Sequence, residues 1–177
     1  MIETLLSSKT RLKLLMKFFL NSSNSSYLRN LEEEFGESTN GIRIELNKFE
    51  KAGFLDSRIE GNKKMFKVNT EHPLFNDLNS ILMKMTGLNH VVDYMLARIG
   101  DLDKVYLVGK LAQGQDTGII DIVLVGDGIN KTFLIEQIEK AEHKIGKKIR
   151  YVNFTTSEFS LPKIEEPSMH PLLLWSK

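Results

Sequence analysis

The 177-residue sequence contains no cysteine, so disulfides, thiolate zinc sites and a cysteine nucleophile are excluded together. It has no apolar run of about eighteen residues, and we therefore expect no membrane-spanning helix. The beginning of the chain also lacks the apolar core of a secretion signal, which favours a cytoplasmic protein. The formal net charge is only +1, so any attraction for nucleic acid has to come from a local basic surface.

Three helical patterns and a hairpin pattern follow one another in the first seventy residues. The apolar spacing predicts helices over 8–20, over 26–35 and from Ser38 or Thr39 to Gly53. In the first helix, we place the basic residues at the polar positions of the pattern. Two strand-like runs then flank Glu60-Gly61-Asn62, which predicts a β-hairpin. The basic residues of the first helix are Lys9, Arg11, Lys13 and Lys17.

This region resembles a known family of regulators. The segments IRIELNKFEKAGFL (42–55) and GNKKMFKVN (61–69) are similar to the recognition helix and wing of ArsR-like winged helix-turn-helix transcription regulators. The resemblance implies sequence-specific binding of double-stranded DNA by a homodimer.

The third predicted helix and the hairpin supply the candidate DNA-binding residues. An arginine can bind guanine with two hydrogen bonds, and an asparagine can do so with adenine. Lysines on the wing would neutralise phosphates. For each residue the alternative is that it only solvates an exposed face. Glu45 and Glu50 on the same helix would oppose DNA. The candidates are Thr39, Asn40, Arg43, Asn47, Lys63, Lys64 and Lys67.

Residues 71–100 read as a helical linker. Pro73 begins a helix with a wide apolar stripe that ends at Gly87, and a second amphipathic pattern runs from Asn89 to Ile99. A stripe this wide either packs on a sheet or forms a dimer seam. We favour the seam, because a single winged helix reads few base pairs.

The remaining sequence predicts a small mixed sheet with strands over 104–108, 119–125 and 148–155 and a helix over 131–145. Its segment GKLAQGQDTGIIDIVLV (109–125) resembles the nucleotidyltransferase pattern, in which a Gly-Ser turn precedes two metal-binding aspartates. Gly109, Gly114 and Asp121 fit that pattern. The family's serine is Lys110 here, and its second aspartate is Val123.

We therefore expect transferase activity to be lost, because two-metal chemistry needs clustered carboxylates. No metal or cofactor is expected. Gly109, Lys110, Gly114 and Asp121 remain as a candidate vestigial anion or nucleotide site, with a purely structural role for Asp121 as the alternative.

Together these patterns predict an α+β protein in four segments. These are a winged helix-turn-helix (1–70), a helical dimerisation linker (71–100), a degenerate nucleotidyltransferase-like domain (101–160) and an irregular C-terminal arm whose end docks on the protein (161–177). The favoured function is a non-enzymatic transcription regulator whose second domain serves sensing or assembly, with an unknown small-molecule or nucleotide effector. The alternatives are an active antitoxin-type nucleotidyltransferase with a winged-helix targeting domain and a protein-interaction adaptor.

Overall fold

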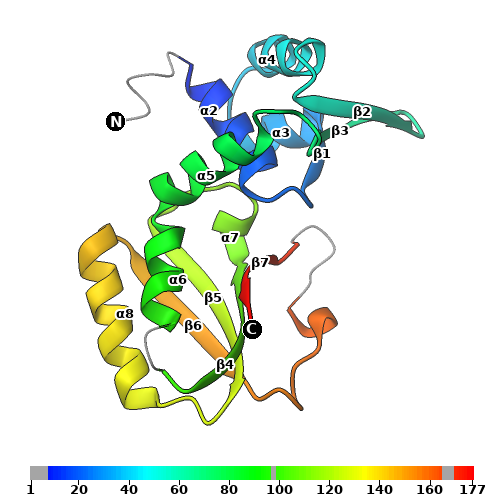
Figure 1. The fold of residues 1–177 in the computed structure, drawn as a ribbon. Helices are drawn as coiled ribbons and strands as arrows, with labels where there is room; N and C mark the ends of the chain where they lie inside the picture. Colours follow the sequence, from blue (N-terminus) through cyan, green and yellow to red (C-terminus); the bar gives the residue numbers. More distant parts are fainter. Residues whose placement is uncertain (1–7, 97–98, 165–169) are drawn as a thin grey trace. The chain divides into compact units, whose positions relative to one another are not determined.

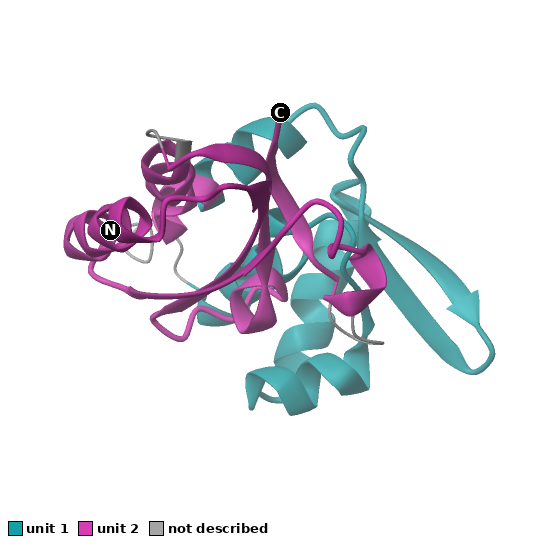
Figure 2. Ribbon diagram, turned by 90° about the horizontal axis from the view of Figure 1, so that it is seen from below, with its two compact units in different colours: residues 1–82 teal, residues 83–177 magenta. Residues whose placement is uncertain are grey.

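A computed structural model describes residues 8–96, 99–164 and 170–177. The chain forms two compact units, residues 1–82 and 83–177 (Figure 2). Each unit combines helices with its own β-sheet, which agrees with the predicted α+β class. The finer division into four segments stays a prediction. Among the described residues, no helix is long and apolar enough to cross a membrane.

The first unit has the predicted order of helices followed by a hairpin (Figure 1). Its three strands form an antiparallel sheet in the order β1-β3-β2. Its elements are α2 (Lys9–Leu15), the π-helix η1 (Met16–Leu20), β1 (Ser25–Tyr27), α3 (Leu28–Phe35), α4 (Thr39–Lys51), β2 (Leu55–Glu60) and β3 (Lys63–Val68).

Local chemistry sets several of these boundaries. The Ser38 hydroxyl accepts a hydrogen bond from the Gly41 backbone N–H at 3.2 Å and caps α4. Gly36 ends α3 in the left-handed conformation. The helix predicted from residue 26 begins only at Leu28, because Ser25–Tyr27 pair with β3. This part of the prediction was wrong, since pairing with a distant strand overrides a short helical pattern.

The core of the first unit contains a cluster of aromatic rings. Phe19 contacts Phe49, Phe54 and Phe75 at ring-centroid distances of 5.8–6.4 Å. All five residues of η1 are buried, including Lys17, which was predicted to lie at a polar position. The Lys17 ammonium is instead paired with Glu34 at 2.7 Å. A buried charge needs such a partner because desolvation without one is very costly.

Helix α5 (Phe75–Thr86) begins in the first unit. The Asn79 side-chain amide donates hydrogen bonds to the carbonyls of Phe19 and Leu20 at 2.7 and 3.2 Å. These bonds fix one face of the helix to the core. Leu74, just before the helix, and Ile81 within it remain exposed.

The second unit has a four-stranded sheet in the order β6-β5-β4-β7. Strands β5 and β6 are parallel and joined through α8, and the other neighbours are antiparallel. The tail, predicted as an irregular arm with a docking end, contributes β7 at the sheet edge. The elements are α6 (Leu88–Leu96), β4 (Asp101–Val108), α7 (Gly109–Ala112), β5 (Ile119–Asp127), α8 (Lys131–Ile145), β6 (Lys148–Phe154), the 3-10 helix η2 (Leu161–Lys163) and β7 (Leu172–Ser176).

The two faces of this sheet have different coverings. Helices α6 and α8 pack together beside the sheet (Figure 1). The opposite face carries Tyr106, Val123 and Val125, and the segment after β6 covers it with Phe159 and Ile164. Because side chains alternate along a strand, Asp121 lies on the same face as Val123. This alternation decides the surroundings of the nucleotidyltransferase-like motif.

Candidate functional site

A groove with a cavity volume of about 820 Å³ lies between α3, α4 and the hairpin of the first unit. It brings together five of the seven predicted DNA-binding residues: Thr39, Arg43 and Asn47 from α4, with Lys63 and Lys64 from β3. Asn40 and Lys67 are exposed, but neither lines the groove. The remaining lining residues are Tyr27, Leu28, Arg29, Glu32, Glu33, Leu46, Asn62 and Phe66.

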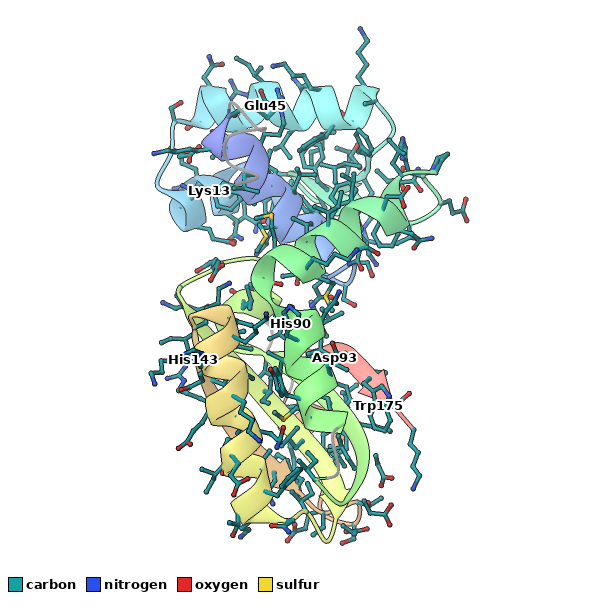
Figure 3. The ribbon with its side chains drawn as sticks, turned by 60° about the vertical axis from the view of Figure 1, so that its left-hand side comes forward. Lys13, Glu45, His90, Asp93, His143 and Trp175 are labelled. Carbon is teal, nitrogen blue, oxygen red and sulfur yellow. The ribbon has the colours of Figure 1, made fainter. Side chains whose placement is uncertain are left out.

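The two acidic residues that seemed to oppose DNA are both paired with cations. Glu45 is buried on α4 (Figure 3) and receives hydrogen bonds from Arg11 and Lys48, each with a shortest distance of 2.9 Å. The Arg11 bond is the main reason why the pKa of Glu45 is lowered. Glu50 receives a hydrogen bond from Lys64 at 2.7 Å, which lowers the pKa of Glu50. The carboxylate of Glu45, which was expected to oppose DNA, points into the protein and is paired there.

The basic side chains of the groove differ in how tightly they are held. The Lys63 ammonium lies 4.3 Å from the Tyr27 ring centroid, a cation–π distance. Lys64 is held by Glu50. Arg43 and Asn47 are exposed, and within the described residues neither side chain makes a hydrogen bond or ion pair. Arg43 and Asn47 are therefore available to a ligand without breaking a bond in the protein.

The groove contains both basic and acidic side chains, and the basic ones are in the majority. Arg29, Arg43, Lys63 and Lys64 line it together with Glu32 and Glu33. Four cations against two carboxylates leave a small positive surplus, on a chain whose net charge is +1. The acids belong to α3, so the positive charge is concentrated along α4 and the hairpin. An anionic ligand would therefore be drawn toward that side of the groove.

Sequence reasoning missed one exposed residue on α4. Ile44 is 46% exposed, although Ile42, Leu46 and Phe49 on the same helix are buried. The same turn rule that places those three inward, about 100° per residue, places Ile44 on the outer face. The signal was present in the sequence as an apolar residue out of phase with the buried stripe.

In the second unit, the turn after β4 brings Gly109 against Asp121. Gly109 has a φ of 69°, and a Cβ at this position would lie 2.7 Å from the Asp121 Oδ2. Only glycine fits this turn without displacing the carboxylate. Gly114 also has a positive φ, of 87°. Lys110 is exposed on the short helix α7.

Asp121 forms a two-pronged ion pair with Arg150. The Arg150 Nε and Nη2 donate to the two carboxylate oxygens at 2.6 and 2.9 Å, and this bonding raises the pKa of Arg150. Register explains the contact, because Asp121 and Arg150 are partners in the parallel pairing of β5 and β6. The strand predicted over 148–155 contains no acid, and sequence reasoning missed that it supplies a base that pairs with Asp121.

Val123 lies where the nucleotidyltransferase pattern has its second aspartate. It is 4% exposed and packs with Tyr106, Val125, Phe159 and Ile164. Beside this cluster, a cleft of about 460 Å³ is lined by Asp121, Arg150, His170 and apolar residues of β4, β5 and β6. The described residues contain no group of three or more histidine, aspartate or glutamate side chains placed to share a metal ion. The neighbours of Asp121 therefore differ from a carboxylate cluster.

The histidines lie on separate elements. His72 Nδ1 accepts the Leu74 backbone N–H at 3.1 Å, and its ring lies 4.2 Å from that of Phe54. His90 lies on α6 and His143 on α8 (Figure 3). Through these two contacts, His72 holds the backbone before α5 and packs against an aromatic ring.

No protein-family description matches the chain, and no curated protein matches it. Among solved structures, reduced HlyU from Vibrio cholerae is 15% identical, with a TM-score of 0.37, over 46% of this chain and 78% of that chain. The AF1382 protein from Archaeoglobus fulgidus is 18% identical, also with a TM-score of 0.37, over 54% of this chain and 98% of that one. Both scores are too low to establish a shared fold or function.

Proposed function

We propose that this protein is a DNA-binding transcription regulator whose first unit is a winged helix-turn-helix. In this proposal α4 is the recognition helix, and the hairpin of β2 and β3 is the wing. The observation that carries it is the groove, which brings Arg43 and Asn47 of α4 together with Lys63 and Lys64 of β3. The ion pairs of Glu45 with Arg11 and of Glu50 with Lys64 support the proposal, because they offset the two negative charges on α4.

The geometry suggests a division of roles. Helix α4 enters the major groove, where Arg43 and Asn47 contact base edges. The neighbouring sugar-phosphate ridge then lies in the protein groove, between α4 and the wing. Lys63 contacts its phosphates, and the capped N-terminus of α4 adds backbone amides. Lys64 contributes to DNA binding only after its ammonium group leaves the Glu50 carboxylate and pairs with a phosphate.

The test begins with in vitro selection of genomic duplex fragments, followed by anisotropy titrations at two salt concentrations. The expected result is specific binding whose affinity falls with salt concentration. The slope of log affinity against log salt concentration should be about −0.9 for each phosphate contact. Arg43→Ala should weaken the selected site by about ten-fold or more and reduce its preference over other sequences. Lys63→Ala should weaken all duplexes alike, and Lys140→Ala, an exposed lysine on α8, should change neither property.

An Arg43→Ala variant with unchanged sequence selection would overturn the assignment of α4. Absence of any salt-dependent duplex binding would overturn the proposed function and favour the protein-interaction adaptor.

We further propose that two copies bind DNA together through α5. Leu74, Leu78 and Ile81 follow the spacing i, i+4, i+7, and the first and last are exposed at 49% and 42%. The adjacent stripe holds Phe75 and Asn79, which contact the core of the first unit. The outer stripe is therefore left for a partner, and a two-fold dimer would present two recognition helices to two half-sites.

Sedimentation measured over a range of concentrations tests this pairing. Ile81→Glu should shift the protein to monomers and weaken binding to the two-half-site DNA. Ile135→Glu changes a similarly exposed isoleucine on α8 and should leave both unchanged. A wild-type protein that remains monomeric at high concentration and on DNA would refute the pairing.

For the second unit we propose sensing or assembly without transferase activity. Two features support this: Asp121 is engaged by Arg150, and the position of the second acid is an apolar residue within a packed cluster. The cleft beside Asp121 is where we would place a small effector. Incubation with labelled nucleotides and Mg²⁺ or Mn²⁺ should yield no transfer. Metal-dependent transfer that Asp121→Ala abolishes would instead establish the active nucleotidyltransferase.

A further inference from the structure

The outer face of α4 presents one large apolar side chain between two amides. Taking Asn40 as the origin and about 100° per residue, Ile44 and Asn47 fall within roughly 40° of it on either side. The buried stripe of Ile42, Leu46 and Phe49 lies on the opposite side of the helix. Ile44 is thus at the part of α4 that points farthest from the core of its unit.

The fold of the first unit does not require isoleucine at this position. A β-branched residue is a weaker helix former than alanine or lysine. Ile44 is also 46% exposed, so its own unit buries only part of its apolar surface. The neighbouring outward positions hold amides and lysines, as a solvent-facing helix surface normally does. Ile44 therefore has apolar surface available for a contact outside the unit.

The surroundings of Ile44 indicate the kind of contact. Among the described residues of α4 it is the one large hydrophobic side chain that is exposed, so this helix does not carry a broad apolar stripe on its outer face. Asn40 and Asn47, on the same face, carry the amide groups that match the N6 and N7 edge of adenine. Thymine, the partner of adenine, displays a 5-methyl group in the same groove, and apolar side chains contact it.

We propose that Ile44 is a specificity-determining residue that packs against the 5-methyl group of a thymine in the major groove. The surface then reads a step containing A·T pairs, with an asparagine on adenine and the isoleucine on a thymine methyl. This inference rests on the proposed DNA-binding function and adds the chemical feature that α4 recognises.

The experiment removes one methyl group at a time. In the selected duplex, each thymine is replaced singly by deoxyuridine, which lacks only the 5-methyl group. Binding of the wild-type protein is measured by anisotropy at fixed salt. One thymine in each half-site should show a loss of about four-fold on replacement, the effect expected for burial of one methyl group.

Ile44→Ala completes the cycle. It should weaken binding to the thymine duplex by a comparable or larger factor, and it should bind the thymine and deoxyuridine duplexes equally at that position. Ile135→Ala, at an exposed isoleucine on α8, should keep the full wild-type response. The melting temperature of Ile44→Ala should stay close to that of the wild type, which separates a lost contact from a lost fold.

Two results would overturn the inference while leaving the proposed function intact: specific DNA binding that no thymine replacement alters, or an Ile44→Ala variant that keeps the wild-type sensitivity to deoxyuridine. A protein that binds no duplex at all would overturn the inference together with the proposed function.

Discussion

Restoring the second acid of the nucleotidyltransferase pattern should destabilise the second unit and leave it inactive. The substitution is Val123→Asp. Val123 is 4% exposed and is surrounded by Tyr106, Val125, Phe159 and Ile164. Arg150 could not easily pair with a carboxylate there, because it already holds both oxygens of Asp121.

The magnitude can be worked from controls of matched size. Val123→Ala should cost about 2 kcal/mol, from two lost carbons and the residual cavity. Val123→Asn should cost roughly 3–5 kcal/mol, because it also buries an amide without assured partners. Val123→Asp should match the asparagine variant while protonated and lose roughly 3 kcal/mol more once it must ionise.

The pH dependence gives the charge effect its sign. Burial raises the pKa of an aspartate in the folded state, so the extra destabilisation is absent below its unfolded pKa of about 4 and grows as the pH rises. The gap between the Asp and Asn variants should therefore be near zero at acid pH and largest at neutral pH. For a domain of this size, the difference of roughly 3 kcal/mol between the two variants at neutral pH corresponds to roughly 12–24 °C in melting temperature.

Trp175 makes the assay specific to the second unit. It is the single tryptophan of the chain and lies in β7, which belongs to that unit (Figure 3). Its fluorescence in urea should follow unfolding of this unit alone. Equal stability of Val123→Asp and Val123→Asn at neutral pH, or metal-dependent nucleotidyl transfer by Val123→Asp, would refute the reasoning.

Two further predictions concern the carboxylates of α4. Glu50→Gln should release Lys64 and remove a negative charge near the groove. A charge roughly 7 Å from a phosphate in water changes the affinity for DNA about three-fold, so the affinity should rise by that factor. The released Lys64 adds a phosphate contact, so the slope of log affinity against log salt concentration should steepen by about 0.9. Weaker binding in anisotropy titrations would contradict this. Glu45 has a lowered folded pKa, so its bond to Arg11 should stabilise the fold above the ordinary value of 4.5 and cease to do so as the pH falls through the folded pKa. Urea unfolding followed by circular dichroism should show Glu45→Gln less stable than wild type by about 1–2 kcal/mol at pH 7, with the difference shrinking as the pH falls below 4.5; a constant difference would argue against the pair.

The elements with strong local signals were predictable from the sequence. Helix α8 has the predicted bounds 131–145, because its N-terminal cap at Asn130 and the left-handed Gly146 mark both ends. The hairpin was predictable because Gly61 sits in the tight turn between two strand-like runs. Five predicted site residues share one groove because helical phase and hairpin register are local properties.

What the sequence could not supply depends on pairing between distant segments. Strands β1 and β7 are short, and each gains its structure from a partner strand elsewhere in the chain. The burial of Lys17 depends on Glu34, and the engagement of Asp121 depends on the register of β6. A periodic sequence pattern cannot predict either contact, because the two side chains meet only after the fold has brought their elements together.

The pairing of β4 with β7 also sets an order of assembly. The two strands come from opposite ends of the second unit, whereas β2 and β3 are joined by a tight turn. Closing the longer loop costs more chain entropy, so we expect β7 to join its sheet late. Until it does, β4 has an unpaired edge that carries the apolar residues Val105, Tyr106 and Leu107. Partly folded chains could aggregate through this edge. The yield of native protein should therefore depend on how quickly this one strand arrives.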